Sequence, residues 1–134
     1  MICPFDVGDE KRFSITVQSN DTASFDSGEV HPVYATFALG RDAEWCCRLF
    51  VLEMKEDGEE GIGTFLSIQH HSPAYVGSKV DFIARVKSIQ KNEIICSYEA
   101  RVGERLVASG EQGQKILKKE RLEQLFEKIK QDSE

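Results

Sequence analysis

The stretch VYATFALGRDAEWCC, from Val33 to Cys47, decides the fold. From about Thr36 to Met54, side chains recur at spacings of three and four residues, which indicates an α-helix. The recurring positions are Ala38, Asp42, Trp45, Leu49 and Leu52. Thr36 is the expected N-cap of this helix. Because the helix is apolar around much of its circumference, we expect other elements to wrap around it.

The segments on either side of this helix alternate as strands do. Residues 12–19 place Phe13, Ile15 and Val17 on one face, and the polar residues 20–32 resemble a long loop. Downstream, strands are expected over 61–70, 79–89, 93–102 and 105–117, with Val80, Phe82, Ala84 and Val86 forming one apolar row. Short connections predict hairpins between these strands and therefore an antiparallel meander.

The last predicted element is a helix over 118–130. Its apolar stripe is Leu122, Leu125, Phe126 and Ile129, by which we expect it to dock on the rest of the chain. One sheet face must cover the central helix, so the sequence predicts an α+β fold. In this fold an antiparallel β-sheet wraps around a central hydrophobic α-helix, and a short C-terminal helix follows. The open edges of such a sheet favour pairing of two copies.

Composition restricts the function classes. The chain of 134 residues has a length typical of one domain, and its net charge of −6 with a pI near 5.1 argues against nucleic-acid binding. No apolar run approaches the roughly 20 residues that cross a bilayer. The cysteines, Cys3, Cys46, Cys47 and Cys96, form no CxxC pair. We therefore expect free thiols in a cytoplasmic protein and no metal site.

His70 ends an alternating run in which Ile62, Thr64, Leu66 and Ile68 share its face, while His71 points away. A histidine at a strand end can simply satisfy a backbone carbonyl. It can also move a proton, because imidazole titrates near neutral pH.

Glu44 lies in the middle of the predicted helix, next to Trp45. Such a glutamate can belong to a solvated face, but a carboxylate partly desolvated beside aromatic groups is a competent general base or nucleophile. Asp42 is the competing acid. It lies about 200° around the helix from Glu44, so one of the two is expected to be structural.

Thr36 and Gly63 can also be interpreted either as structural residues or as parts of a site. A hydroxyl at Thr36 caps the helix and also lies beside its first free amides, where a thioester or ester oxygen could be polarised. A glycine inside a strand, such as Gly63 before Thr64, lets a ligand approach the backbone closely.

At these residues the chain resembles the fluoroacetyl-CoA thioesterase family of the hot-dog superfamily. The resemblance covers roughly residues 30–118 and rests on 33–36 with Glu44-Trp45, on 61–64, and on His70. It implies that Thr36, Glu44 and His70 are catalytic, with Glu44 as base or nucleophile and the other two assisting. It also implies hydrolysis of an acyl-CoA thioester by a homodimer, or by a tetramer built from dimers. Coenzyme A would be part of the substrate, and no separate cofactor is implied.

The chain also departs from the family. Gln114 stands where family members often carry an arginine, and we expect it to contact substrate together with Gly63 and Thr64. Ser27 and Val30 stand where the family has the aromatic pair that gates the fluoroacetyl pocket, so that selectivity does not transfer. The expected substrate is a small or short-chain acyl-CoA.

Two other functions remain open from the sequence. The same fold could bind acyl-CoA without catalysis, in which case Lys79, Arg85, Lys87 or Lys115 would meet the CoA phosphates. A hydratase acting on enoyl thioesters is the third possibility, although its Asp/His motif is not found in the sequence.

Overall fold

The computed structural model describes residues 1–25 and 28–133, with the backbone alone for 23–25 and 28–31. Its elements in chain order are β1 (Glu10–Thr16), η1 (Ser19–Asp21), β2 (Thr22–Phe25), β3 (Gly28–Tyr34), α1 (Thr36–Met54), β4 (Glu59–Leu66), β5 (Gln69–His70), β6 (Lys79–Gln90), β7 (Glu93–Val102), β8 (Arg105–Lys118) and α2 (Lys119–Asp132). None of the described helices is long and apolar enough to cross a membrane.

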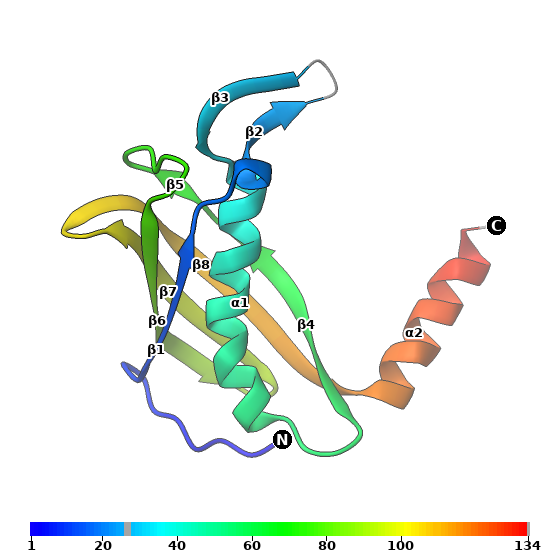
Figure 1. The fold of residues 1–134 in the computed structure, drawn as a ribbon. Coiled ribbons are helices and arrows are strands. Elements are labelled where there is room, and N and C mark those ends of the chain that lie inside the picture. Colours follow the sequence, from blue (N-terminus) through cyan, green and yellow to red (C-terminus); the bar gives the residue numbers. More distant parts are fainter. Residues whose placement is uncertain (26–27, 134) are drawn as a thin grey trace.

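A curled antiparallel sheet curves around one side of α1, as Figure 1 shows. The strands follow the order β1-β6-β7-β8-β4, and the short β5 also pairs with β8. The predicted α+β arrangement, a sheet wrapped around a central helix, is therefore confirmed.

The predicted four-stranded meander is only partly right. β6, β7 and β8 follow one another as hairpins, but β4 pairs with the far side of β8 instead of with β6. Alternation of apolar and polar residues identifies the buried face of a strand, but it does not specify which strand pairs with it. The sheet reaches the other side of α1 only because the last long strand, β8, pairs with the first strand after the helix.

The segment 20–32, predicted to be a loop, contains strands. β2 and β3 pair with each other in a separate two-stranded sheet, which Figure 1 shows at the N-terminal end of α1. Polar residues can form a hairpin through backbone hydrogen bonds without any apolar alternation. The residues expected to replace the gating aromatics fall outside the described part, Ser27 entirely and Val30 in its side chain.

Helix α1 has the predicted bounds, but its cap and its buried stripe differ from expectation. Ala35 is the N-cap and its side chain makes no capping bond, so Thr36 is the first helical residue. Trp45 and Leu52, both expected in the stripe, are each 41% exposed. The buried positions are Ala38, Leu39, Gly40, Asp42, Ala43, Cys46, Cys47, Phe50, Val51 and Met54.

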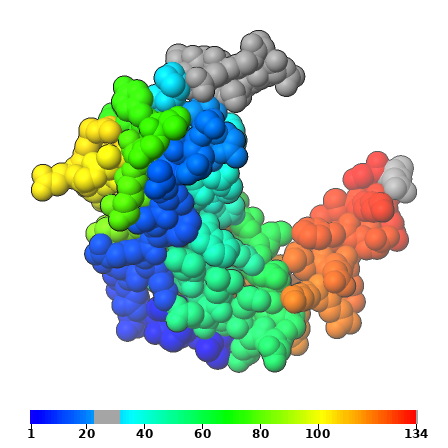
Figure 2. Space-filling model, viewed as in Figure 1, coloured from blue at the N-terminus to red at the C-terminus, as the bar shows by residue number. Residues whose placement is uncertain are grey.

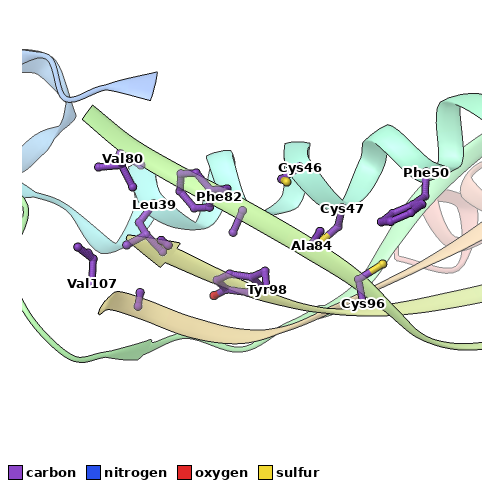
Figure 3. Packing of buried hydrophobic residues seen from close by; sticks show 14 of the residues in the cluster. Leu39, Cys46, Cys47, Phe50, Val80, Phe82, Ala84, Cys96, Tyr98 and Val107 are labelled. Atoms are coloured by element: carbon purple, nitrogen blue, oxygen red, sulfur yellow. The ribbon is translucent and has the colours of Figure 1, made fainter. Parts of the chain in front are cut away.

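The core lies between α1 and the inner face of the sheet (Figure 3). The row predicted on β6, Val80, Phe82, Ala84 and Val86, is buried as expected, and it packs with Phe50 of α1 and Tyr98 of β7. Full burial of side chains of this size contributes about 1.5–3 kcal/mol each. Cys46, Cys47 and Cys96 lie in this core as free thiols, and Cys3 is free and exposed.

Helix α2 does not dock on its own chain. None of its residues is buried, and Leu125, Phe126 and Ile129 are 41%, 52% and 59% exposed. Figure 2 shows the helix standing away from the body of the molecule. The predicted helix exists, but the predicted docking of its stripe is wrong within one chain.

Candidate active site

A cavity of about 640 Å³ lies between α1 and β4. Helix α1 lines it with Glu44, Trp45 and Arg48, strand β4 with Gly61 and Gly63, and β8 with Gln114. The glycines let side chains of α1 lie directly against the backbone of β4. A Cβ atom on Gly61 would lie 2.7 Å from Val51 Cγ1, and one on Gly63 would lie 2.6 Å from Glu44 Oε1.

Glu44, the predicted catalytic carboxylate, is therefore placed against the bare backbone of Gly63, which was predicted to contact substrate. Glu44 Oε1 accepts a hydrogen bond from Gln112 Nε2 at 3.2 Å. The predicted desolvation of Glu44 is not found, because its side chain is exposed and Trp45 beside it is 41% exposed.

Gln112 and Gln114 share the inner face of β8, since they are two residues apart. Gln114 Nε2 donates to Gln112 Oε1 at 3.0 Å. Gln114 borders the cavity, and its predicted contact with substrate stays a prediction. Gln112, which donates to Glu44, was missed by the sequence reasoning. Polar residues at two successive inward positions of a buried strand were the available signal.

Thr36 and His70 meet at the N-terminal end of α1. The distance between Thr36 Oγ1 and His70 Nε2 is 2.9 Å. Both line a second cavity of about 390 Å³, together with Leu39 and Val107. Thr36 belongs to the first turn of α1, where backbone N–H groups lack helical partners and carry partial positive charge.

Among the residues that the structure describes, none lines both cavities. Thr36 and Glu44 are eight residues apart, so their Cα atoms are separated by about 12 Å along the axis of α1. Leu66 and Ile68 contact the helix at Gly40, between the two positions. Within a single chain, Glu44 is therefore separated from Thr36 and His70.

Thr64 does not face the cavity. Its hydroxyl donates to Glu93 Oε2 at 3.0 Å on the outer face of the sheet. The register of β4 against β8 shifts between Gly63 and Phe65, so Thr64 is an extra residue in a β-bulge. The bulge places Leu66 on the helix-facing side with Gly61 and Gly63, and the predicted shared face of Ile62, Thr64 and Leu66 is wrong.

Asp42 is the structural carboxylate of the helix. It is 6% exposed, it accepts a hydrogen bond from the Tyr34 hydroxyl, and Arg41 Nε donates to it at 3.1 Å. Burial and this hydrogen bond raise the pKa of Tyr34 far above its usual range. Asp42 does border the Glu44 cavity, contrary to expectation, but Tyr34 and Arg41 already occupy its carboxylate oxygens.

Arg48 lies one helical turn after Glu44 but does not pair with it. Its guanidinium donates to Glu60 Oε1 at 2.6 Å and to the Gly61 carbonyl at 3.3 Å. The hydrogen bond from Arg48 lowers the pKa of Glu60. Glu44 is therefore held by a neutral amide, and the nearby cation is engaged elsewhere.

Comparison with solved structures supports the same fold. A Thermus thermophilus protein described as a thioesterase superfamily member is 34% identical, with a TM-score of 0.90 and 96% of each chain covered. A hot-dog-like protein from Thermanaerovibrio acidaminovorans is 21% identical, with a TM-score of 0.85 and 93% of each chain covered. The fluoroacetyl-CoA thioesterase FlK is also 21% identical, with a TM-score of 0.84 and coverage of 96% of this chain and 98% of that one.

FlK has also been solved as a variant with fluoroacetate and CoA, and as another variant with acetyl-CoA. Comparison with the curated proteins gives no match. Residues 17–120 match the family described as fluoroacetyl-CoA-specific thioesterase. This match spans most of the chain, including every residue that lines the two cavities except Phe13, and the chain therefore belongs to the FlK thioesterase family.

Proposed function

We propose that this protein hydrolyses a small or short-chain acyl-CoA thioester to free CoA and a carboxylic acid. The observation that carries the proposal is the placement of Glu44 in a 640 Å³ cavity against the bare backbone of Gly63, in a chain of a thioesterase family. The glycine lets the carboxylate lie against the strand backbone, at the wall of the cavity that a thioester would enter. No selectivity for fluoroacetyl-CoA is part of the proposal.

Glu44 would act in one of two ways. It can take a proton from water that attacks the thioester carbon, or it can attack that carbon itself and form an anhydride that water then cleaves. In both cases the C–S bond breaks and the thiolate of CoA leaves and takes up a proton. After a single turnover in H₂¹⁸O, label in the Glu44 carboxylate would establish direct attack with water cleaving the anhydride at the glutamyl carbon, because general-base hydrolysis places the label only in the released acid.

Thr36 and His70 would assist by holding the reacting group and moving a proton. Their hydroxyl–imidazole contact of 2.9 Å suits this task, and the N-terminus of α1 adds partial positive charge beside a carbonyl oxygen. Because they line a different cavity from Glu44, we propose that the working form is a homodimer in which a second copy completes each site.

The exposed apolar side chains on this side of the molecule support the dimer. Phe37 and Trp45 on α1 are 63% and 41% exposed, and Phe65 and Leu66 on the edge strand β4 are 42% and 41% exposed. A sheet edge with apolar flanks of this kind is suited to pairing with another copy.

The test is release of free thiol from acetyl-, butyryl- and hexanoyl-CoA. We expect Glu44→Gln to lower kcat by at least a hundredfold, because the amide can neither accept the proton nor attack. Glu53→Gln is the matched control, since Glu53 is also an exposed carboxylate of α1, paired with Lys11. Full activity of Glu44→Gln would exclude Glu44 from the reaction.

The second candidate is an acyl-CoA-binding module without catalysis. The separation of Glu44 from the Thr36–His70 pair in the single chain favours it if the protein is a monomer. Calorimetric binding of CoA thioesters that are never cleaved would establish this function instead.

A further inference from the structure

Two glutamines lie inside the sheet where apolar side chains are usual. Gln112 and Gln114 of β8 are 1% and 2% exposed. Burial of an amide without partners costs about 1–3 kcal/mol, so each side chain must find hydrogen bonds there. Among the described residues, no buried side-chain nitrogen or oxygen lacks a partner.

The bonds run in one direction toward Glu44. Gln114 Nε2 donates to Gln112 Oε1 at 3.0 Å, and Gln112 Nε2 donates to Glu44 Oε1 at 3.2 Å and to the Gly113 carbonyl at 3.1 Å. An ionised carboxylate only accepts hydrogen bonds, so Gln112 must turn its NH₂ group toward Glu44. The opposite orientation would place its oxygen against the carboxylate and its NH₂ group against that of Gln114.

A hydrogen-bond relay thus runs from Gln114 through Gln112 to Glu44. It uses neutral donors, while Arg48 is held by Glu60 and Gly61. It engages only Oε1, and the structure gives Oε2 no partner among the described residues. A carboxylate fixed in this way keeps one oxygen available in the cavity that it lines.

We propose that Gln112 is a positioning residue for Glu44 and that Gln114 locks the Gln112 amide in its donating orientation. The proposal rests on the proposed function of Glu44. Glu44 is a surface side chain of a helix with several rotatable bonds, and a displacement of about 1 Å at a reacting group can cost up to a hundredfold in rate. The two amides remove that freedom.

The kinetic test uses Gln112→Met, Gln114→Met and their combination on the full chain, with the fastest substrate of the acetyl-, butyryl- and hexanoyl-CoA series. Methionine keeps the volume and removes the amide. We expect Gln112→Met to lower kcat by about 10- to 100-fold with KM within about twofold. Gln114→Met should lower kcat less, and in the Gln112→Met background it should lower kcat no further.

Glu111→Gln is the control, since Glu111 is on the same strand but pairs with Lys87. If Gln112→Met does not fold, as judged by thermal melting, Gln112→Asn replaces it. The shorter side chain keeps an amide in the core but moves its NH₂ group away from Glu44. A kcat within twofold of the parent for the folded Gln112 variant would overturn the proposal. The proposal would also be overturned if Gln114→Met lowered kcat by the same factor in the parent and in the Gln112→Met background. That result would mean that the two substitutions act independently.

A second measurement needs no turnover. In ¹⁵N-labelled protein, the side-chain NH₂ resonances of Gln112 should shift in Glu44→Ala and broaden in Gln114→Met, with Glu53→Ala as the control. Unchanged Gln112 resonances in both variants would overturn the relay even in an active enzyme. If no thioester is cleaved but both changes appear, the proposed function fails and the hydrogen-bond relay stands.

Discussion

Gly63 is the residue on which access to Glu44 depends most. Its missing side chain leaves the space that the Glu44 carboxylate occupies, 2.6 Å from where a Cβ atom would be. The same absence exposes the strand backbone to whatever enters the cavity. The candidate site therefore consists of the Glu44 carboxylate against the backbone of Gly63, with Gln112 donating a hydrogen bond to the carboxylate.

A methyl group at Gly63 should therefore damage activity more than stability. We expect Gly63→Ala to lower kcat/KM by about 10- to 100-fold, because Glu44 must turn away from its hydrogen bond to Gln112. The atom that must move is the end of a flexible side chain, so the melting temperature should change by no more than a few degrees. Steady-state kinetics and thermal melting check both parts, and unchanged kinetics would contradict the prediction.

The two helices differ in how they relate to the sheet. α1 buries residues along its whole length against the concave face of the sheet, while α2 continues from the end of β8 without burying any residue. Periodicity is present in both sequences. What separates them is whether another surface lies opposite the apolar stripe, and that is a property of the tertiary structure.

Equivalent truncations in the two helices should differ widely in effect. Phe50 of α1 is fully buried and packs edge-on against Phe5 with ring centroids 4.9 Å apart, whereas Phe126 of α2 is 52% exposed. We expect Phe50→Ala to lower the free energy of unfolding by about 3–5 kcal/mol and Phe126→Ala by less than about 0.5 kcal/mol. Urea denaturation measures both. A large loss from Phe126→Ala would mean that α2 packs on another copy.

The whole molecule is a curled sheet with β1 and β4 at its edges. The β4 edge is also the side on which Phe65 and Leu66 are exposed and on which the Glu44 cavity opens between strand and helix. Assembly and activity should therefore depend on the same edge.

A charge on this edge should separate the proposed dimer. We expect the parent protein to sediment as a dimer and Phe65→Glu to sediment as a monomer with reduced activity, because a desolvated carboxylate opposes pairing. Val76→Glu is the control, since Val76 is 48% exposed but lies outside the strands. Analytical ultracentrifugation checks this, and a monomeric parent would contradict the dimer.

Stability of the whole fold should fall in alkaline solution. Burial raises the pKa of Cys46 from 9.0 to about 11 and that of Tyr98 from 10.0 to about 12. Above their ordinary pKa values these groups lose protons in the unfolded chain but keep them in the fold, so rising pH favours unfolding. This stability is fully present below about pH 9 and is lost between about pH 9 and 12.

Denaturation at a series of pH values measures this loss. Tyr98→Phe should reduce the slope above pH 10, and Tyr75→Phe should leave it unchanged because Tyr75 is 54% exposed. An equal slope in the parent and in Tyr98→Phe would exclude Tyr98 as a source.

The sequence by itself determined the bounds of α1, the buried row of β6 and the wrapped-helix architecture, and it singled out Thr36, His70, Glu44 and Gly63 as candidate site residues without saying which of them meet. These follow from periodicity, strand parity and the resemblance to a family, all of which are recorded locally along the chain. Thr64 shows where local information ends. One extra residue in a bulge moves it to the outer face, and parity cannot reveal a bulge.

Only the tertiary structure decided which strands are neighbours, that Gln112 supports Glu44, and that Glu44 and the Thr36–His70 pair occupy separate cavities. Each of these depends on contacts between residues far apart in the chain. Gln112 on β8 contacts Glu44 on α1, although the two residues are 68 positions apart in the chain. The pairing of β4 with β8 places them on the same side of the sheet. The periodicity of one segment does not specify its partner strand, because the pairing is stabilised by contacts that form only when the sheet curves around α1.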